Sequence, residues 1–283
     1  MDLATIRRLI VSAVVSDDFL FETLVFKGGN ALNLIHGIGS RASLDIDFSM
    51  SRDFKNLEGA RTRLFKALQG RLSANGYMVF DERMEPKPSE LTDDPTWGGY
   101  TVEFKLIERD KYEKVKGKLE DMRRQSVSVD GAHTGSRKFK IQISKYEYCE
   151  GKTEAEVEYF SCYVYTPLMI GVEKLRAICQ QMPEYTPTIH KVARARDFYD
   201  IHCIIEAEHL DLSEPENLEL IRSMFQAKKV PLYLLGKISE TRDFHAAEWP
   251  AVRDSISEED KGFDFYFDSI VQKIETLKPL WVE

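Results

Sequence analysis

Two short segments of the chain decide the fold: Phe26-Lys27-Gly28-Gly29-Asn30 and Arg41-Ala42-Ser43-Leu44-Asp45-Ile46-Asp47-Phe48. The glycine pair predicts a tight turn, and the residues after it, 31–36, predict a short helix. The second segment alternates strictly between apolar and polar residues, which predicts a strand with Asp45 and Asp47 on the same face. A turn, a helix and a strand with two carboxylates are thus expected close together.

This combination of residue types is typical of one kind of chemistry. Carboxylates two residues apart on a strand lie roughly 6–7 Å from each other at the backbone. Two like charges that close raise each other's proton affinity unless a cation lies between them, and hard oxygen ligands suit Mg²⁺. Backbone N–H groups after a glycine pair can approach a phosphate. Each feature alone also fits an exposed polar strand or an ordinary loop, but their order favours metal-assisted phosphoryl transfer.

Outward from these segments, the pattern predicts an α+β part followed by a helical part, and we place the boundary at Pro167. The expected domains are residues 1–166 and residues 167–283. In the first domain we expect helices over 4–24 and 57–75, strands over 77–80, 100–107, 138–144 and 158–165, and a loop over 84–99. In the second domain we expect helices over 168–179, 192–208, 214–228 and 264–278.

Charge is distributed unevenly along the 283 residues, which carry 39 Lys and Arg against 47 Asp and Glu. Residues 1–165 hold 25 basic and 26 acidic side chains, whereas residues 105–145 alone hold 12 basic and 6 acidic ones. This central segment fits either a nucleic-acid backbone or a solvated surface. No apolar run approaches the roughly 20 residues that span a bilayer. The four cysteines are far apart, so we expect buried thiols.

Three motifs together resemble a known family. Lys27-Gly28-Gly29-Asn30, continued by Arg41-x-Ser43-x-Asp45-Ile46-Asp47-Phe48, is similar to the first motif of the AbiEii/AbiGii-type nucleotidyltransferase toxins. Glu173 to Ala177 resembles the E-K-L-x-A helix of that family, and Arg196 to Ile201 resembles its R-D-x-x-D-[LI] helix. The resemblance implies a DNA polymerase β-like nucleotidyltransferase domain with a mixed sheet, plus a helical C-terminal domain.

The resemblance also implies roles for residues of the first motif. Asp45 and Asp47 would hold Mg²⁺, with Mn²⁺ as an alternative, and align a nucleoside triphosphate. Gly28, Gly29 and Asn30 would cradle phosphate oxygens, although family members often have Ser or Thr where Asn30 stands.

For three other residues of the first motif, two roles stay open. Lys27 and Arg41 would contact phosphate or order the loop. Ser43 would bond phosphate or the strand backbone.

In the later motifs, Lys174 would bind the triphosphate and neutralise the charge that develops on it in the transition state. The alternative for Lys174 is an ordinary solvated lysine. Asp197 and Asp200 share one helical face, so both can approach one cleft. One of them would orient Lys174 or act as a base, unless the two form a structural pair with Arg194 or Arg196.

One departure from the superfamily concerns a third carboxylate, which polymerase β-like enzymes usually carry on a strand after the aspartate pair. The matching strand here is expected over 139–144, and its candidate position holds Gln142. Glu103, Glu147 or Asp200 would then have to supply this function, or the enzyme would work with one firmly held metal ion.

The function implied is the transfer of a nucleoside monophosphate from a triphosphate to an acceptor hydroxyl, with the tRNA 3′ end as one acceptor. The expected setting is a toxin–antitoxin or phage-defence system in a prokaryotic cytoplasm, with a cognate antitoxin as partner. Two alternatives remain. The acceptor would be a protein or a small molecule, or the chain would be an NTP-binding module without catalysis.

Overall fold

The computed structural model of the chain describes residues 2–39, 43–88, 97–115, 118–129, 135–257 and 259–281. The chain divides into two compact units. The first comprises Met1–Ile35 and Ser43–Val164, and the second comprises His36–Ala42 and Tyr165–Glu283. The short segment after Ile35 thus belongs with the C-terminal residues, which no local sequence pattern indicates. Among the described residues, no helix combines the length and apolar character that a bilayer crossing requires.

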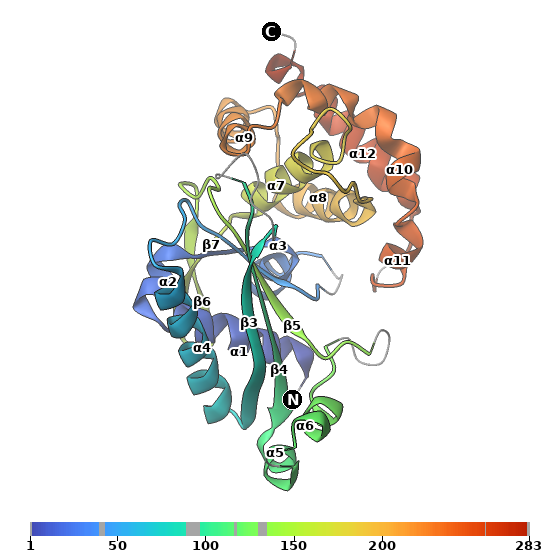
Figure 1. Cartoon of the computed structure of the whole chain (residues 1–283). Helices are drawn as coiled ribbons and strands as arrows, with labels where there is room; N and C mark the ends of the chain where they lie inside the picture. Colours follow the sequence, from blue (N-terminus) through green and yellow to red (C-terminus); the bar gives the residue numbers. More distant parts are fainter. Residues whose placement is uncertain are drawn as a thin grey trace. The chain divides into compact units, whose positions relative to one another are not determined.

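A seven-stranded sheet forms the first unit, with the order β3-β4-β5-β2-β1-β7-β6 (Figure 1). The pairs β1–β7 and β2–β5 are parallel and the other pairs are antiparallel, so the sheet is mixed, as expected. Its strands are β1 (Val25–Lys27), β2 (Ile46–Ser49), β3 (Tyr77–Lys87), β4 (Gly99–Glu108), β5 (Phe139–Ser144), β6 (Thr153–Val157) and β7 (Phe160–Val164).

The helices of the first unit begin where the sequence offers capping side chains. The Asp2 carboxylate accepts from the backbone N–H of Thr5, and the Asn56 side chain accepts from that of Gly59. Two of these helices, α1 and α4, contact each other, and they also contact the outer strands of the sheet. The helices are α1 (Leu3–Val15), α2 (Asp18–Thr23), α3 (Gly28–Ala31), the π-helix η1 (Leu32–His36), α4 (Leu57–Ala74), α5 (Arg109–Val115) and α6 (Leu119–Gln125).

The second unit is helical, as the spacing of apolar residues predicts. At its centre Phe198 packs against the rings of His245, Phe263 and Phe267, at centroid distances of 5.3, 5.6 and 5.0 Å. The elements are α7 (Pro167–Cys179), α8 (Ala195–Glu208), α9 (Pro215–Ala227), η2 (Leu232–Thr241), α10 (Arg242–Ala246), α11 (Trp249–Arg253), α12 (Phe263–Glu275) and η3 (Lys278–Leu280).

Several local expectations were wrong. The helix expected over 4–24 is two helices, because the Asp17 side chain caps a new one by accepting from the N–H groups of Phe19 and Leu20. The polar strand β3 continues to Lys87, into the segment expected as a loop, and β6 was not expected. Leu44 precedes β2 and is 46% exposed, so the apolar alternation begins at Ile46. The cysteines are free, and three of the four are buried.

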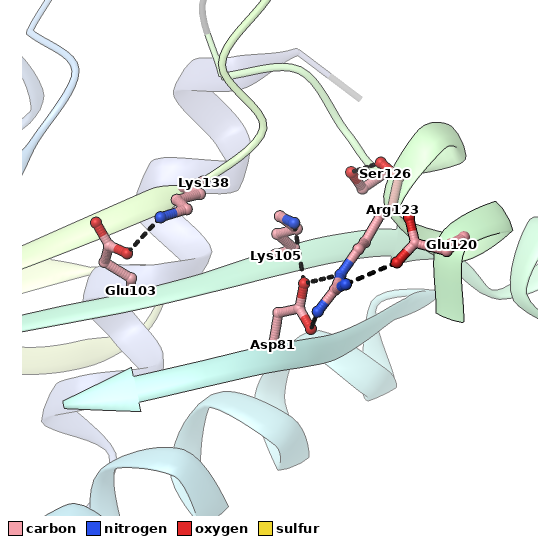
Figure 2. Close-up of polar contacts among 7 residues, drawn as sticks. All are labelled: Asp81, Glu103, Lys105, Glu120, Arg123, Ser126 and Lys138. Carbon is pink, nitrogen blue, oxygen red and sulfur yellow. Dashed lines mark hydrogen bonds and ion pairs between the residues drawn. The ribbon is translucent and has the colours of Figure 1, made fainter. Parts of the chain in front are cut away.

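The part of the basic segment 105–145 that lies around α6 is neutralised by acids of the same unit. The carboxylate of Asp81 binds Lys105 at 2.9 Å and Arg123 at 2.7 Å, and Arg123 also binds Glu120 (Figure 2). These contacts attach α6 to strands β3 and β4 above a small apolar cluster of Ile107, Val115 and Met122. Because Asp81 lies outside the segment, the charge count of the segment overstates its attraction for nucleic acid.

We expect Asp81→Asn to destabilise the first unit by about 1 kcal/mol at pH 7, since it removes the shared acceptor of two cations. The hydrogen bond from Arg123 lowers the pKa of Asp81 to about 2, with burial opposing this and Lys105 adding to it. A carboxyl whose pKa is lower in the folded than in the unfolded state (about 3.9) stabilises the fold above the unfolded value. Urea unfolding should therefore show a difference from wild type that shrinks as the pH falls from about 4 towards 2. An equal difference at pH 7 and pH 3 would contradict this.

Candidate active site

Asp45 and Asp47 lie at the start of β2, one at the bend before the strand and one within it. Both carboxylate residues are half-buried. In the sheet, Asp47 is the register partner of Lys27 on β1 and of Gln142 on β5. Register partners project from the same face, so Lys27, Asp47 and Gln142 form one row across the sheet.

Gly28 packs directly against the carboxylate of Asp47. Its φ of +75° is a conformation that L-residues rarely adopt, and a Cβ added there would lie 2.5 Å from Asp47 Oδ2. The glycine therefore makes room for this carboxylate and lets the chain turn from β1 into the helical segment α3–η1. Sequence reasoning gave Gly28 a role toward phosphate, and the geometry adds a steric role toward Asp47.

Asn30 connects the turn to the strand that carries the aspartates. Its side chain is buried, and Nδ2 donates to the carbonyl oxygens of Asp45 at 2.6 Å and Ser43 at 3.3 Å. This amide thus fixes the backbone that enters β2. A phosphate role for Gly29, Asn30 and Ser43 stays a prediction, and Arg41 lies outside the described residues.

Lys27 is buried beside a carboxylate. Its Nζ lies 3.9 Å from Oε1 of Glu147, and the two side chains are 6% and 3% exposed. The positive charge of a buried lysine is compensated by the negative charge of a buried acid beside it. Of the two roles open to Lys27, the ordering of the turn is therefore the one that the geometry favours.

The strand beside Asp47 holds an amide where a third carboxylate was sought. Gln142 Oε1 accepts hydrogen bonds from Thr101 Oγ1 at 3.1 Å and from Lys87 Nζ at 3.4 Å. Glu103 lies two residues along β4 from Thr101 and is tied to Lys138 at 2.8 Å, and Glu147 faces Lys27. Neither acid occupies the position beside Asp47 in the row.

Arg7 is a residue that the sequence reasoning missed. It lies on α1, is 8% exposed, and donates from Nη2 to the carbonyl of Val129 at 3.3 Å. Burial lowers the pKa of its guanidinium, and the negative charge of Asp45 partly opposes this shift. Arg7 is therefore a buried cation on which the negative charge of Asp45 acts. The sequence places Arg7 within the expected first helix, and no motif or spacing there indicates an interaction with Asp45.

The donor set of the two aspartates fits a hard cation. No cluster of three or more His, Cys, Asp or Glu with metal-binding geometry exists among the described residues. Two carboxylates two residues apart in sequence suit Mg²⁺, which usually takes one or two protein carboxylates and completes its shell with water and phosphate. They do not suit Zn²⁺, which prefers closed sets of nitrogen and sulfur ligands.

In the second unit, Lys174 on α7 binds both aspartates of the next helix. Its Nζ lies 2.8 Å from Asp197 Oδ1 and 2.7 Å from Asp200 Oδ2. All three residues are less than 10% exposed, so the alternative of an ordinary solvated lysine is wrong. The spacing of Asp197 and Asp200, one helical turn apart, is what allows both carboxylates to meet one ammonium.

Asp197 is also coupled to the arginines that precede it. Burial alone would raise the pKa of its carboxyl, but the positive charges of Lys174, Arg194 and Arg196 outweigh burial and hold the pKa below its ordinary value. Arg194 Nη1 lies 3.4 Å from Asp197 Oδ2, and the backbone N–H of Arg194 donates to His245 Nδ1 at 3.0 Å. The pairing with Arg194 therefore exists alongside the pairing with Lys174. Whether Lys174, Asp197 and Asp200 act in catalysis stays a prediction.

We predict that Gly28→Ala displaces the Asp47 carboxylate, because the added methyl group overlaps Oδ2. The affinity for Mn²⁺, followed by electron paramagnetic resonance as a substitute for Mg²⁺, should fall at least about tenfold (about 1.4 kcal/mol). The matched control is Gly70→Ala in α4, where no atom lies within 4 Å of the added Cβ. This control should be stabilising by about 0.5–1 kcal/mol with unchanged Mn²⁺ binding. Wild-type Mn²⁺ affinity in Gly28→Ala would show that the contact does not position Asp47.

We expect Lys174→Met to be strongly destabilising, by about 3–5 kcal/mol, because it leaves two buried carboxylates without their shared cation. Urea unfolding measures this change. Adding Asp197→Asn and Asp200→Asn to Lys174→Met should restore part of the loss, since the neutral amides need no cation. If Lys174→Met loses less than about 1 kcal/mol, the ion pairs contribute little to the fold.

Comparisons with known proteins were consistent with the motifs. Residues 9–272 match the family described as "Nucleotidyl transferase AbiEii toxin, Type IV TA system". Among solved structures, the chain is similar to an antigenic nucleotidyltransferase-like protein from Paracoccidioides brasiliensis, with 13% identity and a TM-score of 0.42 over 88% of this chain and 94% of the other. No curated protein matches the chain. Because the family match covers most of its length, the chain belongs to the AbiEii family of nucleotidyltransferase toxins of type IV toxin–antitoxin systems.

Proposed function

We propose that this chain is a Mg²⁺-dependent nucleotidyltransferase that transfers a nucleoside monophosphate from an NTP to a hydroxyl group of an RNA, with the tRNA 3′ end as the first candidate. The observation that supports this most is the contact of Gly28 with the Asp47 carboxylate. It places the half-buried carboxylate of Asp47 at the turn where the backbone of α3 begins, and this fits the arrangement expected for a metal-bound triphosphate.

In this reaction the acceptor oxygen bonds to the α-phosphorus, and the bond from that phosphorus to the bridging oxygen of the β-phosphate breaks. Pyrophosphate leaves with the bonding electrons. Asp45 and Asp47 would hold the Mg²⁺, which would supply neutralisation of the phosphate charge. The chain contributes alignment and fixed charge rather than a covalent nucleophile. Gln142 has no basic atom, so the carboxylates of Asp45 and Asp47 are the groups of this turn able to accept the acceptor's proton.

The cellular setting follows from the family. A toxin of a type IV system has an antitoxin partner, and we propose that a separately encoded antitoxin counteracts this chain in a prokaryotic cytoplasm, in a toxin–antitoxin or phage-defence system. For Lys174, Asp197 and Asp200 we propose a role in the same reaction. The buried ion pairs support it, because an ammonium held by two carboxylates has a fixed position and charge.

One observation favours a second candidate function. The amide of Gln142 beside Asp47 removes a metal ligand that the superfamily usually has, so an NTP-binding module without turnover is the alternative. A nucleotidyltransferase acting on a protein or a small molecule would share the Asp45–Asp47 chemistry and differ only in its acceptor.

We expect the purified chain, incubated with Mg²⁺, each α-labelled NTP in turn and total cellular RNA plus protein, to transfer label to RNA. The matched control is the double variant Asp45→Asn with Asp47→Asn, which keeps the size of both side chains and removes their charges. Transfer should fall at least about a hundredfold in this control, the scale of losing a key electrostatic contact.

Each result of this experiment selects one function. Label in protein or in a small molecule instead of RNA would overturn the proposed acceptor. Bound nucleotide without transfer would establish the inactive module. Transfer that persists in the double variant would show that Asp45 and Asp47 are not the metal ligands.

A further inference from the structure

The polar face of strands β3, β4 and β5 continues the row that contains Asp47. Register pairs lead from Asp47 to Gln142, then to Thr101 on β4 and to Glu85 on β3. The opposite face of these strands holds apolar residues that are 0–2% exposed, including Val102, Phe139 and Ile141. The polar residues are half-buried or exposed. A polar surface thus begins next to the proposed metal ligands.

Hydrogen bonds fix the direction of the Gln142 amide on this surface. A lysine ammonium can only donate, so the bond from Lys87 identifies the acceptor atom as Oε1, and Thr101 donates to the same atom. The amide nitrogen consequently points away from Lys87 and Thr101. In the part of the chain that the structure describes, this nitrogen has no hydrogen-bond acceptor. It is a donor available to a ligand.

The charge of this face is positive. Its cations are Arg83, Lys87, Lys138 and Lys140, and its acids are Glu85 and Glu103. Glu103 is shared between Lys138 at 2.8 Å and Lys140 at 3.9 Å. Lys87 has no acidic partner within the described residues. The surface around α5 and α6 carries less unpaired positive charge, because Asp81 there pairs with both Lys105 and Arg123.

The spacing of the cations indicates an elongated anion. Lys140 and Lys87 lie in rows that are four residues apart along the strands, which corresponds to roughly 13 Å. The Lys87 ammonium lies 3.4 Å from Gln142 Oε1, so its charge reaches the row midway between the two. Three donors that follow one another along the strands match a chain of phosphodiesters better than a single phosphate, and contacts from lysine and amide donors to successive phosphates are typical of nucleic-acid backbones.

We propose that this face, defined by Lys87, Gln142 and Lys140, binds the sugar-phosphate backbone of a single-stranded RNA acceptor and directs its end towards Asp47. Lys87 and Lys140 contact phosphates, and the amide nitrogen of Gln142 donates to a phosphate oxygen between them. This assignment rests on the proposed function for the identity of the reaction. The binding of RNA to the face is testable without turnover.

The test measures the affinity of a fluorescent single-stranded RNA of 12 nucleotides by anisotropy, at several salt concentrations. We expect Lys87→Gln with Lys140→Gln to weaken binding at least tenfold. The slope of log affinity against log salt should also become shallower by about 1.4, because each phosphate that a lysine neutralises contributes about 0.7 to the slope. Gln142→Glu should weaken binding as well, because it replaces a donor with a negative charge. The affinity for NTP, measured in parallel, should stay unchanged in the lysine variant.

The matched control is Arg61→Gln with Lys66→Gln on α4, which removes the same charge from a half-buried and an exposed position on that helix. Its affinity and salt slope should stay close to wild type. Equal losses in both double variants would overturn the assigned surface, as would wild-type binding in the Lys87/Lys140 variant or no binding of RNA to the wild-type chain. If one of these results is found and the wild-type chain still transfers label to RNA, only this surface is rejected and the proposed function stands. RNA binding that depends on Lys87 and Lys140, without any label transfer, would support the surface and reject the proposed function.

Discussion

The close approach of the Gly28 Cα to the carboxylate of Asp47 is the constraint on which the candidate site depends. Three neighbouring strands position these residues. Gly28 directly follows β1, Asp47 lies on β2, and Gln142 is its register partner on β5. A side chain at position 28 would occupy the space of Oδ2. The positive φ of Gly28 turns the chain into α3 at the same position. One residue thus sets the position of a carboxylate and the direction of the helical segment beside it.

Each of the two units contains buried charged side chains. In the first unit, Lys27 faces Glu147, and Arg7 is a buried cation on which the charge of Asp45 acts. In the second unit, Lys174 lies between Asp197 and Asp200. Charges buried at this cost are in some proteins retained for a function or for specificity. Lys27, Lys174, Asp197 and Asp200 lie in the segments that resemble the family motifs, whereas Arg7 and Glu147 lie outside them.

Much of the fold follows from local patterns, because helices and half-buried strands have short periodicities. Helices α7, α8, α9 and α12 and strand β5, with its alternating burial, were predicted closely, whereas η2, α10, α11 and η3 were not expected. The C-terminal half of the edge strand β3 was not predicted, because its residues, among them the exposed Glu85 and Lys87, do not alternate between apolar and polar. The assignment of His36 to the second unit depends on contacts distant in sequence, which no local pattern contains.

Part of the local arrangement around the candidate residues follows from the sequence. The motifs singled out Asp45 and Asp47 in the first unit and Lys174 in the second, since each stands at a fixed spacing from other polar residues, and their roles stay predictions. Arg7 was not predictable, because its proximity to Asp45 arises only when α1 packs beside the sheet. The orientation of the Gln142 amide was equally hidden, since it depends on Lys87 from a strand 55 residues away in sequence.

The most direct test of the account is a crystal structure with Mn²⁺ and a non-hydrolysable NTP analogue, with Mn²⁺ located by its anomalous scattering. The account predicts one strong anomalous peak within about 2.0–2.4 Å of carboxylate oxygens from both Asp45 and Asp47. It also predicts that the peak is bridged to the triphosphate. A peak coordinated by other residues, or a triphosphate bound away from the Gly28 turn, would contradict the account.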